Sequence, residues 1–194
     1  MTPAFAPTTR AAAATGPRVA AVCAVASAAI GAAGVAFLAG MFGAFALGAR
    51  SLGMTLGLIN DSLVLASFPL ITPAMLTLRA RLRPQAPRVI DLATLVGLAA
   101  VAAIVVLQAL LVRGDLTFEE QIGWLSIAFV AFDAWLLVVG WVGRRSGLLP
   151  GGITMALVGA TYVGYPAWAL WAARHLSGGA IFAPADPSAD PSAG

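Results

Sequence analysis

The sequence predicts an all-α membrane protein, a polytopic transmembrane helix bundle with five spans. Of its 194 residues, 60% are hydrophobic and only 10% are charged, which lies outside the range of ordinary soluble domains. The charged residues occur in clusters, and the apolar runs between them are long enough to cross a bilayer. One run begins at Trp124 and ends at Trp141, so about 26 Å of helix separates two side chains that favour membrane interfaces.

The chain is expected to divide into one membrane domain and two polar ends. Residues 1–18 predict a disordered cytoplasmic arm, and residues 177–194 predict a disordered tail. The membrane domain, residues 19–176, contains five expected helices at about 19–49, 52–78, 89–112, 118–143 and 150–176. A signal peptide cleaved after Ala28 is the alternative for the first run. The apolar run continues for twenty-one residues beyond that site, which favours an uncleaved span.

The first two spans differ in what their faces carry. In the first, small residues recur at every fourth position and favour close helix packing; they are Ala20, Ala24, Ala28, Ala32, Ala36, Gly40, Ala44 and Gly48. In the second, a stripe of seven-residue spacing contains Gly53, Asn60, Ser67 and Ala74, and Asp61 stands beside it. Pro69 and Pro73 cannot donate backbone hydrogen bonds, so a kink is expected there.

Spans three to five are each marked by a few polar or aromatic residues. Asp91 lies in the first turn of the third span, where a carboxylate interacts favourably with the helix dipole, and Gln108 lies near its far end. Thr117 and Glu120 fit a capping box at the start of the fourth. In that span Asp133 shares a face with Ser126 and Gly140, which predicts that it points into the bundle. Pro150 can open the fifth span, whose distal aromatic residues predict an interfacial belt; they are Tyr162, Tyr165, Trp168 and Trp171.

The distribution of arginine predicts the orientation in the membrane. With the N-terminus inside, five spans place eight Arg on the cytoplasmic side and three outside. We therefore expect a bacterial cytoplasmic (inner) membrane protein with a cytoplasmic N-terminus and an external C-terminus. The basic loops are expected to contact anionic lipid head groups through Arg79, Arg81, Arg83, Arg88, Arg144 and Arg145.

The last part of the apolar sequence carries a resemblance. Residues 145–176 combine a Leu149-Pro150 entry with Tyr165-Pro166-Ala167-Trp168 near the exit, and residues 57–61 are loosely similar as well. In these features the chain resembles a family of bacterial multi-pass integral membrane proteins with no assigned activity. The resemblance implies a bacterial origin and a compact helical bundle.

Two acids inside apolar runs are the sharpest candidates for a functional site. An acid at the bilayer centre costs about 3 kcal/mol on insertion scales, so Asp61 and Asp133 must be sheltered from lipid. They could form a proton relay or a cation-coupling site, or each could be a neutral acid that donates one interhelical hydrogen bond. The intramembrane polar candidates for binding are Asn60, Asp61, Ser67, Ser126, Asp133 and Tyr162.

The sequence argues against most catalytic chemistry. His175 is the sole histidine and Cys23 the sole cysteine, which gives no expected metal site, haem site or disulfide. No nucleophile elbow and no P-loop occurs. A net charge of +3 spread over loops does not predict nucleic-acid binding. Trp135 and Trp141 could stack on a pigment or quinone but are more typical of core or belt residues. We therefore expect no cofactor and no enzymatic activity.

Two functions fit these features. The first is a non-catalytic accessory or packing subunit of a membrane complex, which associates through small-residue helix faces. The alternative is a small proton- or cation-coupled carrier that uses Asp61 and Asp133. The expected partners are the lipid bilayer and other membrane protein subunits or a second copy of the chain.

Overall fold

All regular structure in the described part of the chain is α-helical. The computed structural model describes residues 8–152, 155, 159 and 165–176. Its helices are α1 (Thr8–Ala46), α2 (Arg50–Leu82), α3 (Pro87–Arg113), α4 (Phe118–Arg145) and α6 (Tyr165–Leu176). The predicted all-α bundle is thereby confirmed, and α1 to α4 contain the first four expected spans.

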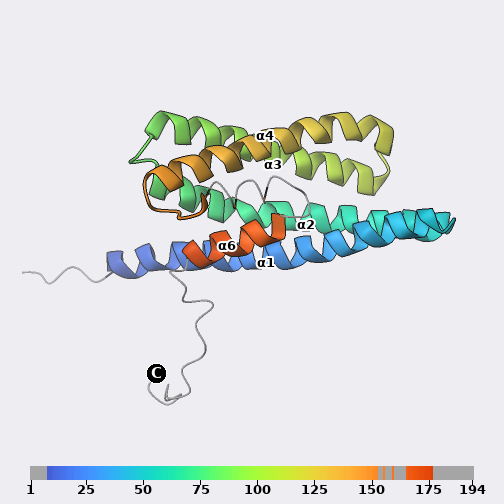
Figure 1. Cartoon of the computed structure of the whole chain (residues 1–194), viewed down its shortest axis with the longest axis horizontal. Coiled ribbons are helices and arrows are strands. Elements are labelled where there is room, and N and C mark those ends of the chain that lie inside the picture. Colours follow the sequence, from blue (N-terminus) through green and yellow to red (C-terminus); the bar gives the residue numbers. More distant parts are fainter. Residues whose placement is uncertain (1–7, 153–154, 156–158, 160–164, 177–194) are drawn as a thin grey trace, which may run out of the picture.

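The first four helices form two antiparallel hairpins that lie side by side, as Figure 1 shows. Gly48, in the turn between α1 and α2, has a φ of 75°, and Gly114, after α3, has a φ of 77°; both values lie in the left-handed region that suits glycine. We call the end of the bundle that holds the α2–α3 loop and the last turn of α4 the basic end. The opposite end holds the α1–α2 turn and the acidic loop between α3 and α4.

Four of these helices are long and apolar enough to cross a membrane. They are Gly16–Ala46 within α1, and the whole of α2, α3 and α4. An apolar stripe on α4 stays exposed from end to end, from Trp124 through Val130 to Trp141. The opposite face of α4 is buried, with Phe132 and Trp135 each 1% exposed. A helix that buries one face and exposes apolar side chains on the other is suited to lipid contact.

The expected fifth span differs from the structure. Helix α6 has twelve residues, about 18 Å, which is roughly half of what a crossing requires. Arg81, near the end of α2, donates hydrogen bonds of 3.0 Å to the carbonyl oxygens of both His175 and Leu176. The last turn of α6 therefore lies at the basic end, the same end at which residues 150–152 follow α4. Within the described residues, four candidate spans are present rather than five.

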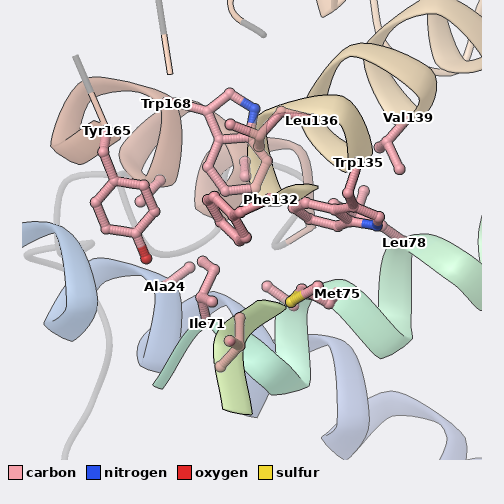
Figure 2. Close-up of a cluster of buried hydrophobic side chains, with 14 of the residues drawn as sticks. Ala24, Ile71, Met75, Leu78, Phe132, Trp135, Leu136, Val139, Tyr165 and Trp168 are labelled. Carbon is pink, nitrogen blue, oxygen red and sulfur yellow. The ribbon is translucent and has the colours of Figure 1, made fainter. Parts of the chain in front are cut away.

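Helix α6 lies along α1, and its aromatic side chains fill the space between the hairpins (Figure 2). Trp168 is 1% exposed and meets Trp135 of α4 edge to face, with the ring centroids 5.6 Å apart. Tyr165 is 5% exposed. The expected interfacial belt is therefore wrong for Tyr165 and Trp168, because both rings, in the first turn of α6, are buried against Phe68 of α2 and Trp135 of α4.

The capping signal predicted at the start of α4 is confirmed. Thr117 Oγ1 accepts from the Glu120 amide at 3.3 Å, and a Glu120 carboxylate oxygen accepts from the Thr117 amide at 2.9 Å, which confirms the capping box.

Helix α2 continues through both Pro69 and Pro73. The small-residue row of α1 is buried at Ala20, Ala24, Ala28 and Ala44 but exposed at Ala32, Ala36 and Gly40, so the middle of the row does not pack inside the bundle.

Gly97 of α3 provides a test of this packing. A Cβ atom there would lie 2.7 Å from Trp135 Cγ and 2.8 Å from Met75 Cε. We expect Gly97→Ala to lower the free energy of unfolding by about 1–3 kcal/mol through overpacking, measured as thermal unfolding in detergent. Gly123→Ala on α4 is the matched control, because nothing lies within 4 Å of the place that its Cβ atom would take and alanine favours helix. Equal shifts in the two variants would contradict the packing described.

Candidate functional site

A large cavity lies between the α1–α2 hairpin and α4 on the side away from the basic end. Its volume is about 1220 Å³, and it is bounded mainly by α1, α2 and α4. Helix α6 lies along α1 in the half of the bundle toward the basic end, as Figure 1 shows. Of the predicted polar candidates, Asn60, Asp61, Ser126 and Asp133 all line this cavity. Ser67 is buried outside the lining, and Tyr162 lies outside the described residues.

The cavity has a polar mouth and an aromatic floor. Arg50, Thr117 and Glu119 line it at the starts of α2 and α4, at the end opposite the basic end. Its floor consists of Phe68, Phe132 and Tyr165, one ring from each of α2, α4 and α6. The Phe68 and Tyr165 rings stack with centroids 5.3 Å apart, and Phe132 meets Phe68 edge to face at 5.4 Å. The cavity is thus closed toward the basic end by packed rings.

Asp61 belongs to a chain of amide groups that crosses three helices. The Asn60 amide donates to Asp61 Oδ1 at 3.4 Å, and the Gln108 amide of α3 faces the same carboxyl group. Gln121 of α4 donates to Gln108 Oε1 at 3.2 Å, which leaves the NH₂ of Gln108 to face Asp61. Gln108 and Gln121 are 3% and 1% exposed. Asp61 therefore receives donors from protein on one side while lining the cavity on the other.

Asp133 is placed differently from Asp61. It is half-buried and lines the cavity, which agrees with the predicted inward direction. Among the described residues, the structure assigns its carboxyl group no hydrogen bond and no ion pair. Ser126, which was expected to share a face with Asp133, donates to the Ile122 carbonyl of its own helix at 2.7 Å. The space beside Asp133 is therefore available to water or to a ligand.

A buried hydroxyl chain fixes the floor of the cavity. Ser27 Oγ donates to the Ser67 carbonyl at 2.8 Å and lies 2.7 Å from Tyr165 Oη. Because Ser27 has a single proton and uses it on Ser67, Tyr165 must be the donor to Ser27. Figure 2 shows the Tyr165 hydroxyl directed toward α1. The chain joins α1, α2 and α6 at one level, and it holds the first turn of α6 at the middle of the bundle.

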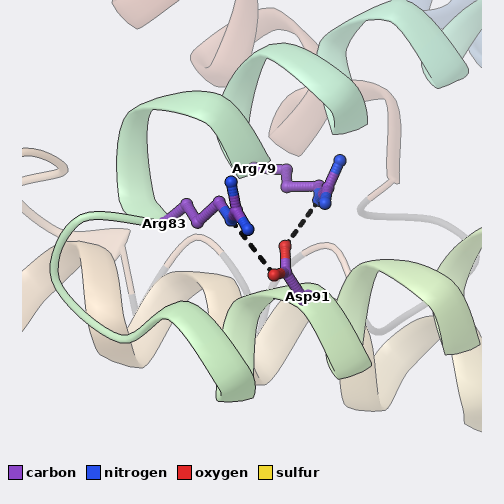
Figure 3. Close-up of polar contacts among 3 residues, drawn as sticks. All are labelled: Arg79, Arg83 and Asp91. Carbon is purple, nitrogen blue, oxygen red and sulfur yellow. Dashed lines mark hydrogen bonds and ion pairs between the residues drawn. The ribbon is translucent and has the colours of Figure 1, made fainter.

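The arginines expected at lipid head groups have protein contacts at the basic end. Arg79 and Arg83 bind the two carboxylate oxygens of Asp91 at 2.7 and 3.1 Å, as Figure 3 shows. The guanidinium of Arg145 lies 4.2 Å from the Trp141 ring centroid, a cation–π contact at the edge of the apolar stripe. Helix α3 begins at Pro87 and has no acidic residue in its first turn, so the expected dipole role of Asp91 is wrong; its ion pairs instead close the α2–α3 loop.

Two site features were not found by sequence reasoning. Gln121 was not singled out, and Gln108 was noted only as a polar residue near a helix end, yet together they extend the polar contacts of Asp61. Ser27 lies just before the possible cleavage position after Ala28, and no structural role was expected for it, although it anchors Tyr165. In each case the available signal was a polar side chain within an apolar run, where burial without a partner is costly.

Four long apolar helices around a cavity with polar residues define an integral membrane protein of the α-helical class. No family model, no curated protein and no solved structure matches the chain. The described residues contain no group of three or more His, Cys, Asp or Glu that could hold a metal ion.

The hydroxyl chain can be tested by a double-mutant cycle. Ser27→Ala leaves the buried Tyr165 hydroxyl without its partner, and Tyr165→Phe removes that hydroxyl. We expect each single variant to lower the free energy of unfolding and the pair to show a coupling energy of about 0.6–1.7 kcal/mol, measured by unfolding in mixed micelles. Strictly additive effects would mean that the two hydroxyl groups do not interact.

Proposed function

We propose that the protein is a small, non-catalytic carrier in a bacterial inner membrane, coupled to protons or cations through Asp61 and Asp133. The observation that supports this most is that one cavity reaches both acids. A carboxylate in an apolar bundle must be neutralised or paired, and a cavity lets protons or cations do this in exchange.

The two acids do not behave alike as structural groups. A purely structural role would require each acid to donate one interhelical hydrogen bond. The amides at Asp61 donate toward its carboxyl group, which makes that group an acceptor. Asp133 makes no such bond to the described residues. Asp133 is accordingly the better candidate for direct ligand contact, whereas the carboxyl group of Asp61 is held by amide groups of the protein.

The orientation that fits best is a four-span one with both ends of the described chain in the cytoplasm. Helix α6 ends at the basic end, so Arg174 lies on the cytoplasmic side in this orientation. Nine Arg are then cytoplasmic and two, Arg50 and Arg113, are external. This asymmetry is stronger than the eight against three of the five-span arrangement. The mouth of the cavity then opens to the outside.

An accessory subunit is the second candidate. It is favoured by the exposed middle of the small-residue row, Ala32, Ala36 and Gly40, which could accept a neighbouring helix closely. It leaves the cavity without a role. The two candidates differ in one respect that can be measured, because an accessory subunit has no requirement for a charged group at Asp61 or Asp133.

The carrier proposal predicts loss of transport when either acid is neutralised. Purified protein is reconstituted into vesicles containing pyranine, and proton movement is followed after a gradient of sodium, potassium or an organic cation is imposed. We expect Asp133→Asn and Asp61→Asn each to lower the flux at least tenfold while insertion is unchanged, because the exchangeable charge is lost. Asp115→Asn is the matched control, since Asp115 lies in the acidic loop and pairs with Arg113 at 3.0 Å. Full flux in both cavity variants would rule out the carrier.

The orientation predicts where a C-terminal reporter will lie. Green fluorescent protein fused after Gly194 should be fluorescent in cells, and alkaline phosphatase at the same position should be inactive, because both would remain in the cytoplasm. The same reporters in the acidic loop, after Asp115, should give the opposite pair of results. An active phosphatase at the C-terminus would restore the five-span arrangement.

A further inference from the structure

We propose that the cavity binds an amphiphilic organic cation, an ammonium or phosphonium ion that carries aromatic or aliphatic groups. This inference rests on the proposed function, because it names the solute class of the same cavity. It is argued from the charge, the surface chemistry and the size of the lining.

The charges on the cavity wall favour a cationic ligand. Asp61 and Asp133 lie inside, and Glu119 lies at the mouth, whereas Arg50 is the one basic residue among the described residues of the lining. An anion would face two carboxyl groups with no basic group beside them within the described lining. Asp133 has a carboxyl group on the cavity wall that the described protein does not engage. A monovalent cation would provide the opposite charge that this group otherwise lacks.

The rest of the wall does not suit a small metal ion. The described residues offer no cluster of three acidic, His or Cys side chains, so an ion such as Ca²⁺ would be short of its oxygen ligands. Most lining side chains are instead apolar, and seven of them carry aromatic rings: Phe42, Phe45, Phe68, Phe118, Phe129, Phe132 and Tyr165. Aromatic faces attract organic cations and also pack against apolar substituents.

The volume is also that of an organic ligand site. Pockets for drug-sized molecules enclose about 300–1,000 Å³, and this cavity is somewhat larger at about 1220 Å³. Asp61 lies between the polar mouth and the aromatic floor, and Asp133, next to Phe132 in the chain, is level with the floor. A bound cation would therefore place its charge beside Asp133 and its apolar groups among the rings of Phe129 and Phe132, which both precede Asp133 within about one turn of α4.

Two probes of equal shape and opposite charge test the inference. Binding of radiolabelled tetraphenylphosphonium and of tetraphenylborate to the purified full chain is measured by equilibrium dialysis in dodecyl maltoside. We expect saturable binding of one tetraphenylphosphonium per chain and at least tenfold weaker binding of tetraphenylborate. Comparable binding of both ions would show that the cavity recognises only apolar shape, as it would for a lipid chain, and would overturn the inference.

Variants then locate the binding site. Asp133→Asn should weaken tetraphenylphosphonium binding at least tenfold, and Phe129→Leu should weaken it severalfold, because each removes a different attraction. Asp115→Asn, outside the cavity, should leave binding unchanged. Unchanged binding in both cavity variants, with the native elution volume retained on gel filtration, would place the cation elsewhere and contradict the proposal.

The failure of this inference can be told apart from failure of the carrier. If tetraphenylphosphonium does not bind but proton flux in vesicles still depends on Asp61 and Asp133, the solute class is wrong and the carrier stands. If the flux is also independent of both acids, the proposed function is wrong as well.

Discussion

The structure depends on how the gap between two helix hairpins is filled. Helix α1 packs closely on α2, α3 on α4, and α2 on α3, but α2 and α4 contact each other only weakly across the groove between them. At the basic end, α6 and its rings occupy this groove, with Trp168 against Trp135 and Tyr165 against Phe68. At the other end nothing in the described chain fills it, and the cavity results. Because α6 occupies only the part of the groove near the basic end, the protein has an aromatic core at that end and a polar cavity at the other.

Hydrogen bonds at both ends of α6 maintain this arrangement. At the first turn, Tyr165 donates to Ser27, and at the last turn Arg81 donates to the terminal carbonyl oxygens. The carbonyl groups at a helix C-terminus lack partners within the helix, so a guanidinium with several donors is well suited to them. Because α6 is secured at the middle and at the edge of the bundle, the floor of the cavity is fixed by protein rather than by lipid packing.

Sequence reasoning succeeded where the determining forces are local. The charge clusters bounded α2, α3 and α4 to within a few residues, the Thr117 cap was correct, and Trp124 and Trp141 mark an exposed apolar stripe. Asp61 and Asp133 were found as site candidates because charge in an apolar run is costly wherever the run lies. Pairs such as Ser27 and Tyr165, 138 residues apart, could not be found, because no local pattern relates them.

The sequence by itself determined that four long apolar helices form and that two acids lie within them, because the cost of moving each side chain from water depends on residue type alone. Only the tertiary structure decided that residues 150–176 begin and end at the basic end, and that one cavity joins Asp61 to Asp133. An apolar run loses the same contact with water whether it crosses a bilayer or packs within a bundle. Whether such a run crosses the bilayer or packs within the bundle therefore depends on shape and on specific partners, such as Arg81 and Ser27, that lie far away in the chain.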